Sequence, residues 1–99
     1  MSVLLVGMSH RSAPVALLER LSMDANVQHG AATALIKQPS LSEAMIISTC
    51  NRLEVYTVTN AFHSGVEDVL TVLARVSGVP EDELRGYLAD DGTLEWSYG

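Results

Sequence analysis

The spacing of apolar residues changes several times along the chain, and each change indicates a new strand, loop or helix. Residues 3–7 form a short, continuous apolar run that ends at a glycine, which predicts a buried strand. Residues 8–11, Met-Ser-His-Arg, predict a loop. Pro14 suits the first turn of a helix, because the N–H that proline lacks has no partner there. The apolar stripe of that helix is formed by Leu17, Leu18 and Leu21.

The middle of the chain changes from a helical to a strand pattern. Asp24 is placed to cap a second helix with its side-chain oxygen, and apolar residues follow it at four-residue intervals. These residues are Val27, Ala31 and Leu35. Pro39 ends this helix. Residues 44–48 then predict a second buried strand, and residues 53–58 predict a third because they are rich in β-branched and aromatic residues.

The last third of the chain begins with a long helical pattern. Ser64 and Glu67 have the spacing of a capping box. The apolar positions that follow the helical period are Val66, Val69, Leu70, Leu73 and Val76. Gly78 stands where a helix ends in the left-handed conformation. Pro80 then opens a short helix whose acidic first turn complements the positive end of the helix dipole.

The order of these elements predicts the fold class. Residues 91–92, Asp-Gly, predict a turn, and residues 94–98 predict a last strand. The order is then strand, two helices, two strands, helix, short helix, strand. It predicts an α+β fold, a ferredoxin-like split βαβ sandwich with an antiparallel sheet and helices on one face. We find no internal repeat or linker, so we expect one domain over residues 1–99.

Composition is that of a small globular domain. Apolar residues make up 47% of the chain and charged residues 18%. No apolar run is long enough to span a membrane, and the N-terminus lacks the features of a secretory signal. The single cysteine excludes an internal disulfide, so we expect a cytoplasmic protein. The net charge of −6 has the wrong sign for a domain that binds nucleic acid by its own charge.

Cys50 is the strongest candidate for chemistry. It follows a predicted strand and lies among polar residues, a position that exposes a reacting group on a rigid support. A thiolate is a strong nucleophile, and a neighbouring cation such as Arg52 favours its formation. From pattern alone, the more common role of a lone cysteine is that of a small buried apolar side chain. The three histidines and one cysteine lack zinc-site spacing, and no glycine-rich dinucleotide or phosphate motif is present.

Two segments of the chain carry a resemblance to a known family. Residues 48–56, STCNRLEVY, resemble the S-T-C-N-R-x-E signature of glutamyl-tRNA reductase. Residues 7–15, GMSHRSAPV, are similar to that family's first motif, and the spacing between the two motifs also fits. The likeness covers about residues 3–88. It indicates the family's N-terminal catalytic domain, with Cys50 as its nucleophile.

The resemblance implies a reaction in two steps. The Cys50 thiolate attacks the ester of glutamyl-tRNA, releases the tRNA and forms a glutamyl thioester. Hydride from NADPH then reduces the thioester to glutamate-1-semialdehyde, the precursor of 5-aminolevulinate, haem and other tetrapyrroles. A thioester is more electrophilic than the ester, so one difficult step becomes two easier ones.

The resemblance also implies roles for the neighbours of the cysteine. Arg52 offers a planar fork for the side-chain carboxylate of the substrate. Without the family, a surface ion pair of Arg52 with Glu54 or with another surface acid is the more common role. Thr49 and Asn51 are expected to orient the glutamyl group or to donate to the developing oxyanion. His10 either assists the thiol or fixes its own loop by hydrogen bonds, and the second role is favoured.

The family's remaining parts are not found in this sequence. They are a histidine-leucine segment, a Gly-Leu-Asp-Ser stretch, an NADPH-binding domain and a helical domain that makes the full-length enzyme a homodimer. Residues 89–99 match the family poorly. We therefore expect this chain alone to lack reductase activity, because it shows no cofactor site. Two alternatives stay open: a short relative that binds haem through the Cys50 thiolate or binds a protein partner, and a structural domain without a site.

Overall fold

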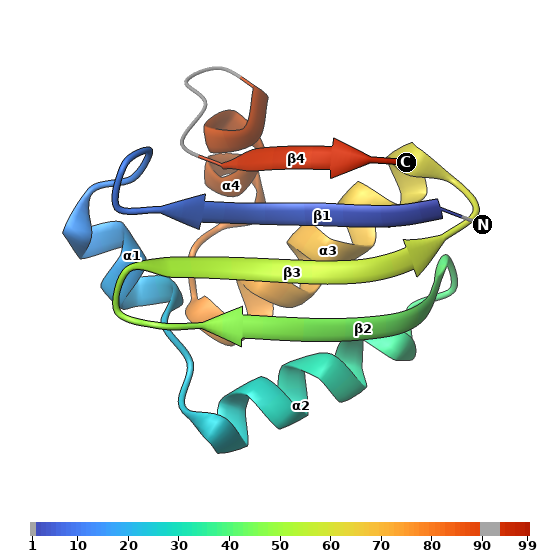
Figure 1. Cartoon of the computed structure of the whole chain (residues 1–99), viewed down its shortest axis with the longest axis horizontal. Helices are drawn as coiled ribbons and strands as arrows, with labels where there is room; N and C mark the ends of the chain where they lie inside the picture. The colour runs from blue at the N-terminus through green and yellow to red at the C-terminus, as the bar shows by residue number, and fades with distance from the viewer. Residues whose placement is uncertain (1, 90–93) are drawn as a thin grey trace.

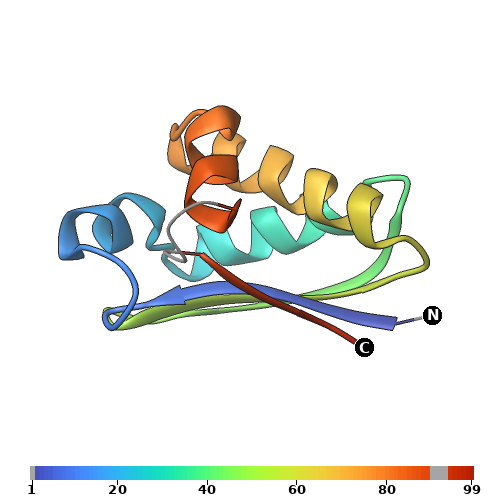
Figure 2. The same ribbon diagram turned by 90° about the horizontal axis from the view of Figure 1, so that it is seen from above.

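A four-stranded antiparallel sheet carries the helices of the described residues on one of its faces (Figures 1 and 2). The computed structural model describes residues 2–89 and 94–99. In chain order the elements are β1 (Ser2–Ser9), α1 (Val15–Leu21), α2 (Ala25–Ile36), β2 (Leu41–Ser48), β3 (Arg52–Thr59), α3 (Phe62–Ser77), α4 (Glu81–Ala89) and β4 (Glu95–Tyr98). Seen from above, the opposite face of the sheet is open (Figure 2).

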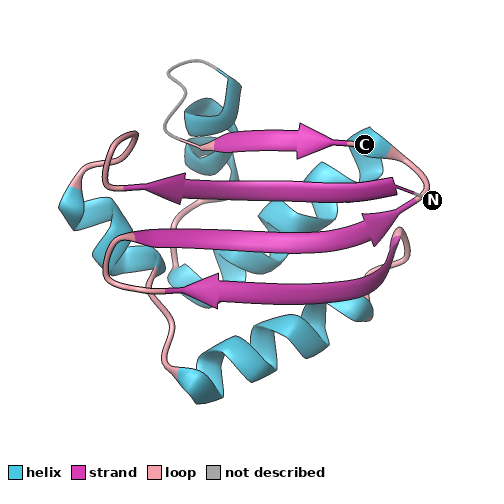
Figure 3. Ribbon diagram, in the orientation of Figure 1, coloured by secondary structure: helices cyan, strands magenta, loops and turns pink. Residues whose placement is uncertain are grey.

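The sheet has the strand order β2-β3-β1-β4, and neighbouring strands are antiparallel throughout (Figure 3). β1 and β2 therefore run in the same direction with β3 between them, and α1 and α2 connect them. In the same way, α3 and α4 connect β3 to β4 across β1. This is the split βαβ arrangement, so the predicted α+β sandwich is confirmed.

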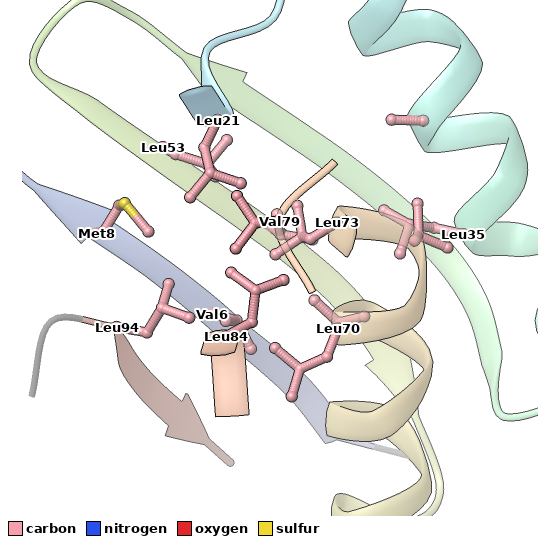
Figure 4. Packing of buried hydrophobic residues seen from close by; sticks show 14 of the residues in the cluster. Val6, Met8, Leu21, Leu35, Leu53, Leu70, Leu73, Val79, Leu84 and Leu94 are labelled. Carbon is pink, nitrogen blue, oxygen red and sulfur yellow. The ribbon is translucent and has the colours of Figure 1, made fainter. Parts of the chain in front are cut away.

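The hydrophobic core fills the space between the sheet and the helices (Figure 4). Successive side chains of a strand point to opposite faces, so the positions of β3 alternate between buried and more exposed. On β1 the buried apolar side chains are those of Leu4, Val6 and Met8. The helices contribute mainly leucines: Leu17, Leu18, Leu21, Leu35, Leu70, Leu73 and Leu84. Each such side chain contributes roughly 1.5–3 kcal/mol when it is fully buried, so this layer holds the helices to the sheet.

Several helix ends lie where single residues of the sequence predict them. Asp24 caps α2 by accepting the N–H of Val27 at 2.9 Å. Gly78 follows α3 with a φ of +77°, the left-handed conformation that glycine adopts without strain. The first turn of α4 carries three acidic residues, as predicted. In the described part of the chain, no helix combines the length and the apolar character that crossing a membrane requires.

The capping box predicted at Ser64 and Glu67 is wrong. The helix α3 already begins at Phe62, and no side chain caps it. The turn before it is closed by Thr59, whose hydroxyl oxygen accepts the N–H of Ala61 at 3.2 Å. Phe62 also packs against two aromatic rings of β4. Tertiary contacts therefore move the start of this helix to an earlier residue than its own sequence suggests.

The strand β2 is an edge strand, and the prediction that it is buried is wrong. It pairs with β3 alone and begins earlier than predicted, at Leu41. Met45 and Ile47 are 53% and 38% exposed, because a continuous apolar run does not tell one covered face from two. The strand β1 also extends beyond its predicted end and continues to Ser9. The turn predicted at residues 91–92 lies outside the described residues.

Gly7 allows β1 to lie close to β3. A Cβ atom at this position would lie 2.6 Å from the carbonyl oxygen of Leu53, and backbone cannot move aside as a flexible side chain can. We expect Gly7→Ala to lower the free energy of unfolding by about 1–3 kcal/mol. Gly30 on α2 has no atom within 4 Å of its Cβ position, so Gly30→Ala should raise stability by up to about 1 kcal/mol. Urea unfolding measures both; an unchanged midpoint for Gly7→Ala would contradict the expectation.

Candidate functional site at the turn between β2 and β3

Cys50 lies at the surface, in the short connection between β2 and β3. Thr49 and Asn51 flank it in this turn. The thiol is exposed, so the hypothesis of a buried apolar cysteine is wrong. The two strands pair up to the base of the turn, where Ser48 lies opposite Leu53. A paired hairpin therefore presents the only cysteine of the chain to solvent.

Thr49 builds this turn with both its backbone and its side chain. Its N–H donates to the carbonyl oxygen of Arg52 at 2.9 Å. Its hydroxyl oxygen accepts the N–H groups of Asn51 and Arg52, each at 3.2 Å. These bonds fix the backbone on both sides of Cys50. The hydroxyl proton of Thr49 and the backbone N–H of Cys50 find no acceptor among the described residues and stay available to a ligand.

A second turn, after β1, is bonded to the first. His10 donates its backbone N–H to the carbonyl oxygen of Asn51 at 2.8 Å, which extends the pairing of β1 with β3 beyond Ser9 and Arg52. Ser9 and Ser12 tighten this second turn, because each bonds to the other. The ring of His10 is exposed and makes no hydrogen bond to the described residues. His10 is therefore brought to the cysteine's turn by its backbone and not by its imidazole.

Arg52 opens β3 and faces Glu54 on the same strand. Its Nη1 atom lies 3.7 Å from Glu54 Oε2, so the surface ion pair that is the more common role of such an arginine is present. Glu54 also accepts the hydroxyl of Tyr56 at 3.2 Å. Partial burial and the Glu54 carboxylate together raise the pKa of Tyr56 above its ordinary value. The Arg52 side chain is 55% exposed, so most of its N–H donors remain available to a ligand.

Two hollows of similar size flank the turn, one on the helix side of the sheet and one on its open face. The first, here called the Cys50 hollow, has a volume of about 480 Å³ and lies between α1 and the turn. Its lining includes Leu18, Glu19, Met23, Asp24, Thr49 and Cys50. The second, the Arg52 hollow, has a volume of about 520 Å³. Its lining includes Gly7, His10, Arg11, Arg52, Glu54 and Glu95. Cys50 and Arg52 therefore line different hollows.

Sequence reasoning missed the contribution of α1 to this site. Leu18 and Glu19 line the Cys50 hollow, although both precede the cysteine by some thirty residues. Met23, just after α1, donates its backbone N–H to Ser48 Oγ at 3.1 Å and so ties this helix to the end of β2. In the sequence, Glu19 only marks the polar face of a helix. No local pattern signals that this face lies beside the cysteine.

The described residues form neither a cluster of metal ligands nor the usual pattern of a dinucleotide site. No three histidine, cysteine or acidic side chains among them gather as metal ligands. Dinucleotide sites typically lie at a glycine-rich turn between a parallel strand and a helix. Here the sheet is antiparallel, and residues 10–14, His-Arg-Ser-Ala-Pro, which lead from β1 into α1, contain no glycine. The reactive group that the turn presents is an exposed thiol, with polar groups around it.

Comparison with known proteins adds an independent finding. A family model described as "Glutamyl-tRNAGlu reductase, N-terminal domain" matches residues 6–93, a range that contains both motif segments. Proteins named glutamyl-tRNA reductase are similar to the chain at 72% identity over 88 residues in Corynebacterium aurimucosum and at 67% over 86 residues in Corynebacterium efficiens. The relative in Corynebacterium diphtheriae is 66% identical over 88 residues. These matches cover 87–89% of this chain but only 18–20% of each relative, so the chain spans about a fifth of their length.

Proposed function

The chain belongs to the glutamyl-tRNA reductase family of oxidoreductases, and from this membership we propose that it is the family's catalytic N-terminal domain, in which Cys50 receives the glutamyl group of glutamyl-tRNA. The observation that carries the proposal is the exposure of Cys50 on a hydrogen-bonded turn. A bulky aminoacyl-tRNA ester can reach such a thiol, whereas a core thiol would be closed to it.

The proposed step is an acyl transfer. The Cys50 thiolate attacks the ester carbonyl carbon with its electron pair, and a carbon–sulfur bond forms. The bond between that carbon and the 3′-terminal ribose oxygen breaks, and the ribose oxygen takes up a proton as tRNA leaves. The product is a glutamyl thioester, which is more reactive toward a nucleophile than the original ester.

The turn supplies hydrogen-bond donors for the negative charge that develops on the carbonyl oxygen. The backbone N–H of Cys50 and the hydroxyl of Thr49 are free of other acceptors within the described residues, and both adjoin the thiol in sequence. The side-chain amide of Asn51 is a third donor at the same turn. Donors held in place before the reaction stabilise a developing oxyanion without rearrangement. We assign these three groups to the oxyanion and to the orientation of the glutamyl group.

Arg52 and His10 are the remaining residues in the proposal. The guanidinium of Arg52 has donors left after its 3.7 Å contact with Glu54, and these would bind the side-chain carboxylate of the substrate. The backbone of His10 secures the turn, while its ring stays at the rim of the Arg52 hollow. The ring's part in the reaction is therefore secondary to this positioning.

Reduction of the thioester belongs to the enzyme as a whole. For a glutamyl-tRNA reductase we infer hydride transfer from NADPH, yielding glutamate-1-semialdehyde for 5-aminolevulinate and tetrapyrrole synthesis. The described residues do not fit a dinucleotide, since their sheet is antiparallel and lacks the glycine-rich turn. We therefore assign to this chain the acyl transfer and no part of the hydride step.

Transfer of labelled glutamate from glutamyl-tRNA to the protein tests the proposal. The wild-type protein should gain one glutamyl group, which hydroxylamine removes as expected for a thioester. Cys50→Ser should gain none, because a serine hydroxyl without a dedicated base is far less nucleophilic. Low salt is used, because salt weakens the contacts of tRNA phosphates with basic side chains, which are few in a chain with a net charge of −6. Equal labelling and equal ester hydrolysis by both proteins would refute a nucleophilic role for Cys50.

The variant Arg52→Lys distinguishes two roles of Arg52: binding of the substrate's side-chain carboxylate and a surface ion pair with Glu54. Lysine keeps the charge near Glu54 but loses the planar fork, so acyl transfer should weaken by about 2 kcal/mol while stability changes by less than about 0.5 kcal/mol. Arg20 is the matched control, because its contact with Glu83 is also 3.7 Å long. Arg20→Lys should leave both quantities unchanged. A wild-type rate of acyl transfer in Arg52→Lys would exclude the proposal that Arg52 binds the side-chain carboxylate of the substrate.

A further inference from the structure

Glu19 lies in the Cys50 hollow, and its carboxylate has no partner among the described residues. The other acid of this hollow, Asp24, is engaged as the cap of α2, where it accepts the N–H of Val27 at 2.9 Å. None of the residues that line the hollow is basic. The hollow therefore attracts a cation, and Glu19 is the carboxylate that is free to bind it.

The backbone of Glu19 is firmly held even though its side chain is exposed. Its carbonyl oxygen accepts both the N–H and the hydroxyl of Ser22, at 3.4 and 2.9 Å. The buried residues of the same helix are Leu17, Leu18 and Leu21. The bond from Met23 N–H to Ser48 Oγ joins the end of this helix to β2. Packing therefore holds the backbone of Glu19 in a fixed relation to the turn that carries the thiol.

Cationic side chains lie on the other side of the turn. The residues that line the Arg52 hollow include Arg52 and Arg11 as well as the acids Glu54 and Glu95. The only charged residues that line the Cys50 hollow are acids. Because Cys50 belongs to the turn between these two hollows, we expect a ligand that lies across the turn to meet a carboxylate at one end and a guanidinium at the other.

A glutamyl group has the complementary arrangement of charges. Its reacting carbonyl carbon adjoins the carbon that carries the α-ammonium, and its carboxylate lies at the far end of the side chain. Building on the proposed function, we propose that Glu19 determines specificity by binding the α-ammonium, while Arg52 receives the side-chain carboxylate. The glutamyl group then spans the turn with its carbonyl carbon at the sulfur of Cys50. An acyl group without the α-amine loses one of these two anchors.

Acylation of Cys50 by two small thioesters tests this inference. One is a glutamyl α-thioester, and the other is the glutaryl thioester, which lacks only the amine. Rates of adduct formation are followed by intact mass, and each is divided by the rate with a free cysteine derivative to remove intrinsic reactivity. The wild-type protein should prefer the glutamyl thioester by tenfold or more. Glu19→Gln should lose this preference, with an unchanged rate for the glutaryl thioester, and Glu19→Asp should regain part of it.

Glu43→Gln is the matched control, because Glu43 is an exposed acid on β2 outside both hollows. It should keep the wild-type preference. A wild-type preference that persists in Glu19→Gln would overturn the inference and leave acyl transfer to Cys50 intact. Absence of any Cys50 adduct in the wild-type protein would instead overturn the proposed function and this inference with it. Urea unfolding of each variant confirms that the rates come from folded protein.

Discussion

The pairing of β1 with β3 is the interaction on which the site depends. Eight residue pairs keep these strands in register, and Gly7 allows the close approach because a larger residue would meet the Leu53 carbonyl oxygen. The 2.8 Å bond from the His10 N–H to the Asn51 carbonyl oxygen carries the pairing into the turn. As a result, the turn with Cys50 and the turn after β1 lie together at one end of the sheet. A shift in this register would separate the motif that contains the histidine from the motif that contains the cysteine.

The position of the turn explains how Glu19 and Arg52, which are distant in the sequence, come to line hollows on its two sides. Helices cover one face of the sheet, so Glu19 of α1 lines the Cys50 hollow there. The other face is open, and Arg52 lines the second hollow on that face. The thiol itself needs no long loop to reach the surface, because the hairpin ends in a tight turn closed by Thr49. Most of the site's geometry is therefore a consequence of a small antiparallel sheet with one covered face.

The sequence predicts those features whose cause is local. Asp24 and Gly78 act on their own helices, so the end of α3 and the start of α2 follow from single residues. The start of α3 at Phe62 does not, because aromatic rings of β4 hold it. In the same way, the edge position of β2 depends on strand order. The exposure of Cys50 was expected from the resemblance of residues 48–56 to the family's signature and not from hydropathy. The place of Glu19 depends on contacts such as the Met23–Ser48 bond, between residues 25 positions apart, which no pattern in the chain encodes.

We propose that the turn holds a glutamyl group on Cys50 between opposite charges. A crystal structure of the protein after reaction with a glutamyl α-chloromethyl ketone tests this arrangement, because displacement of chloride by the thiolate leaves a stable thioether. We expect alkylation of Cys50, with the α-ammonium at hydrogen-bond distance from Glu19 and the side-chain carboxylate at the guanidinium of Arg52. Alkylation at another residue, or a glutamyl group whose carboxylate lies against α1, would contradict it.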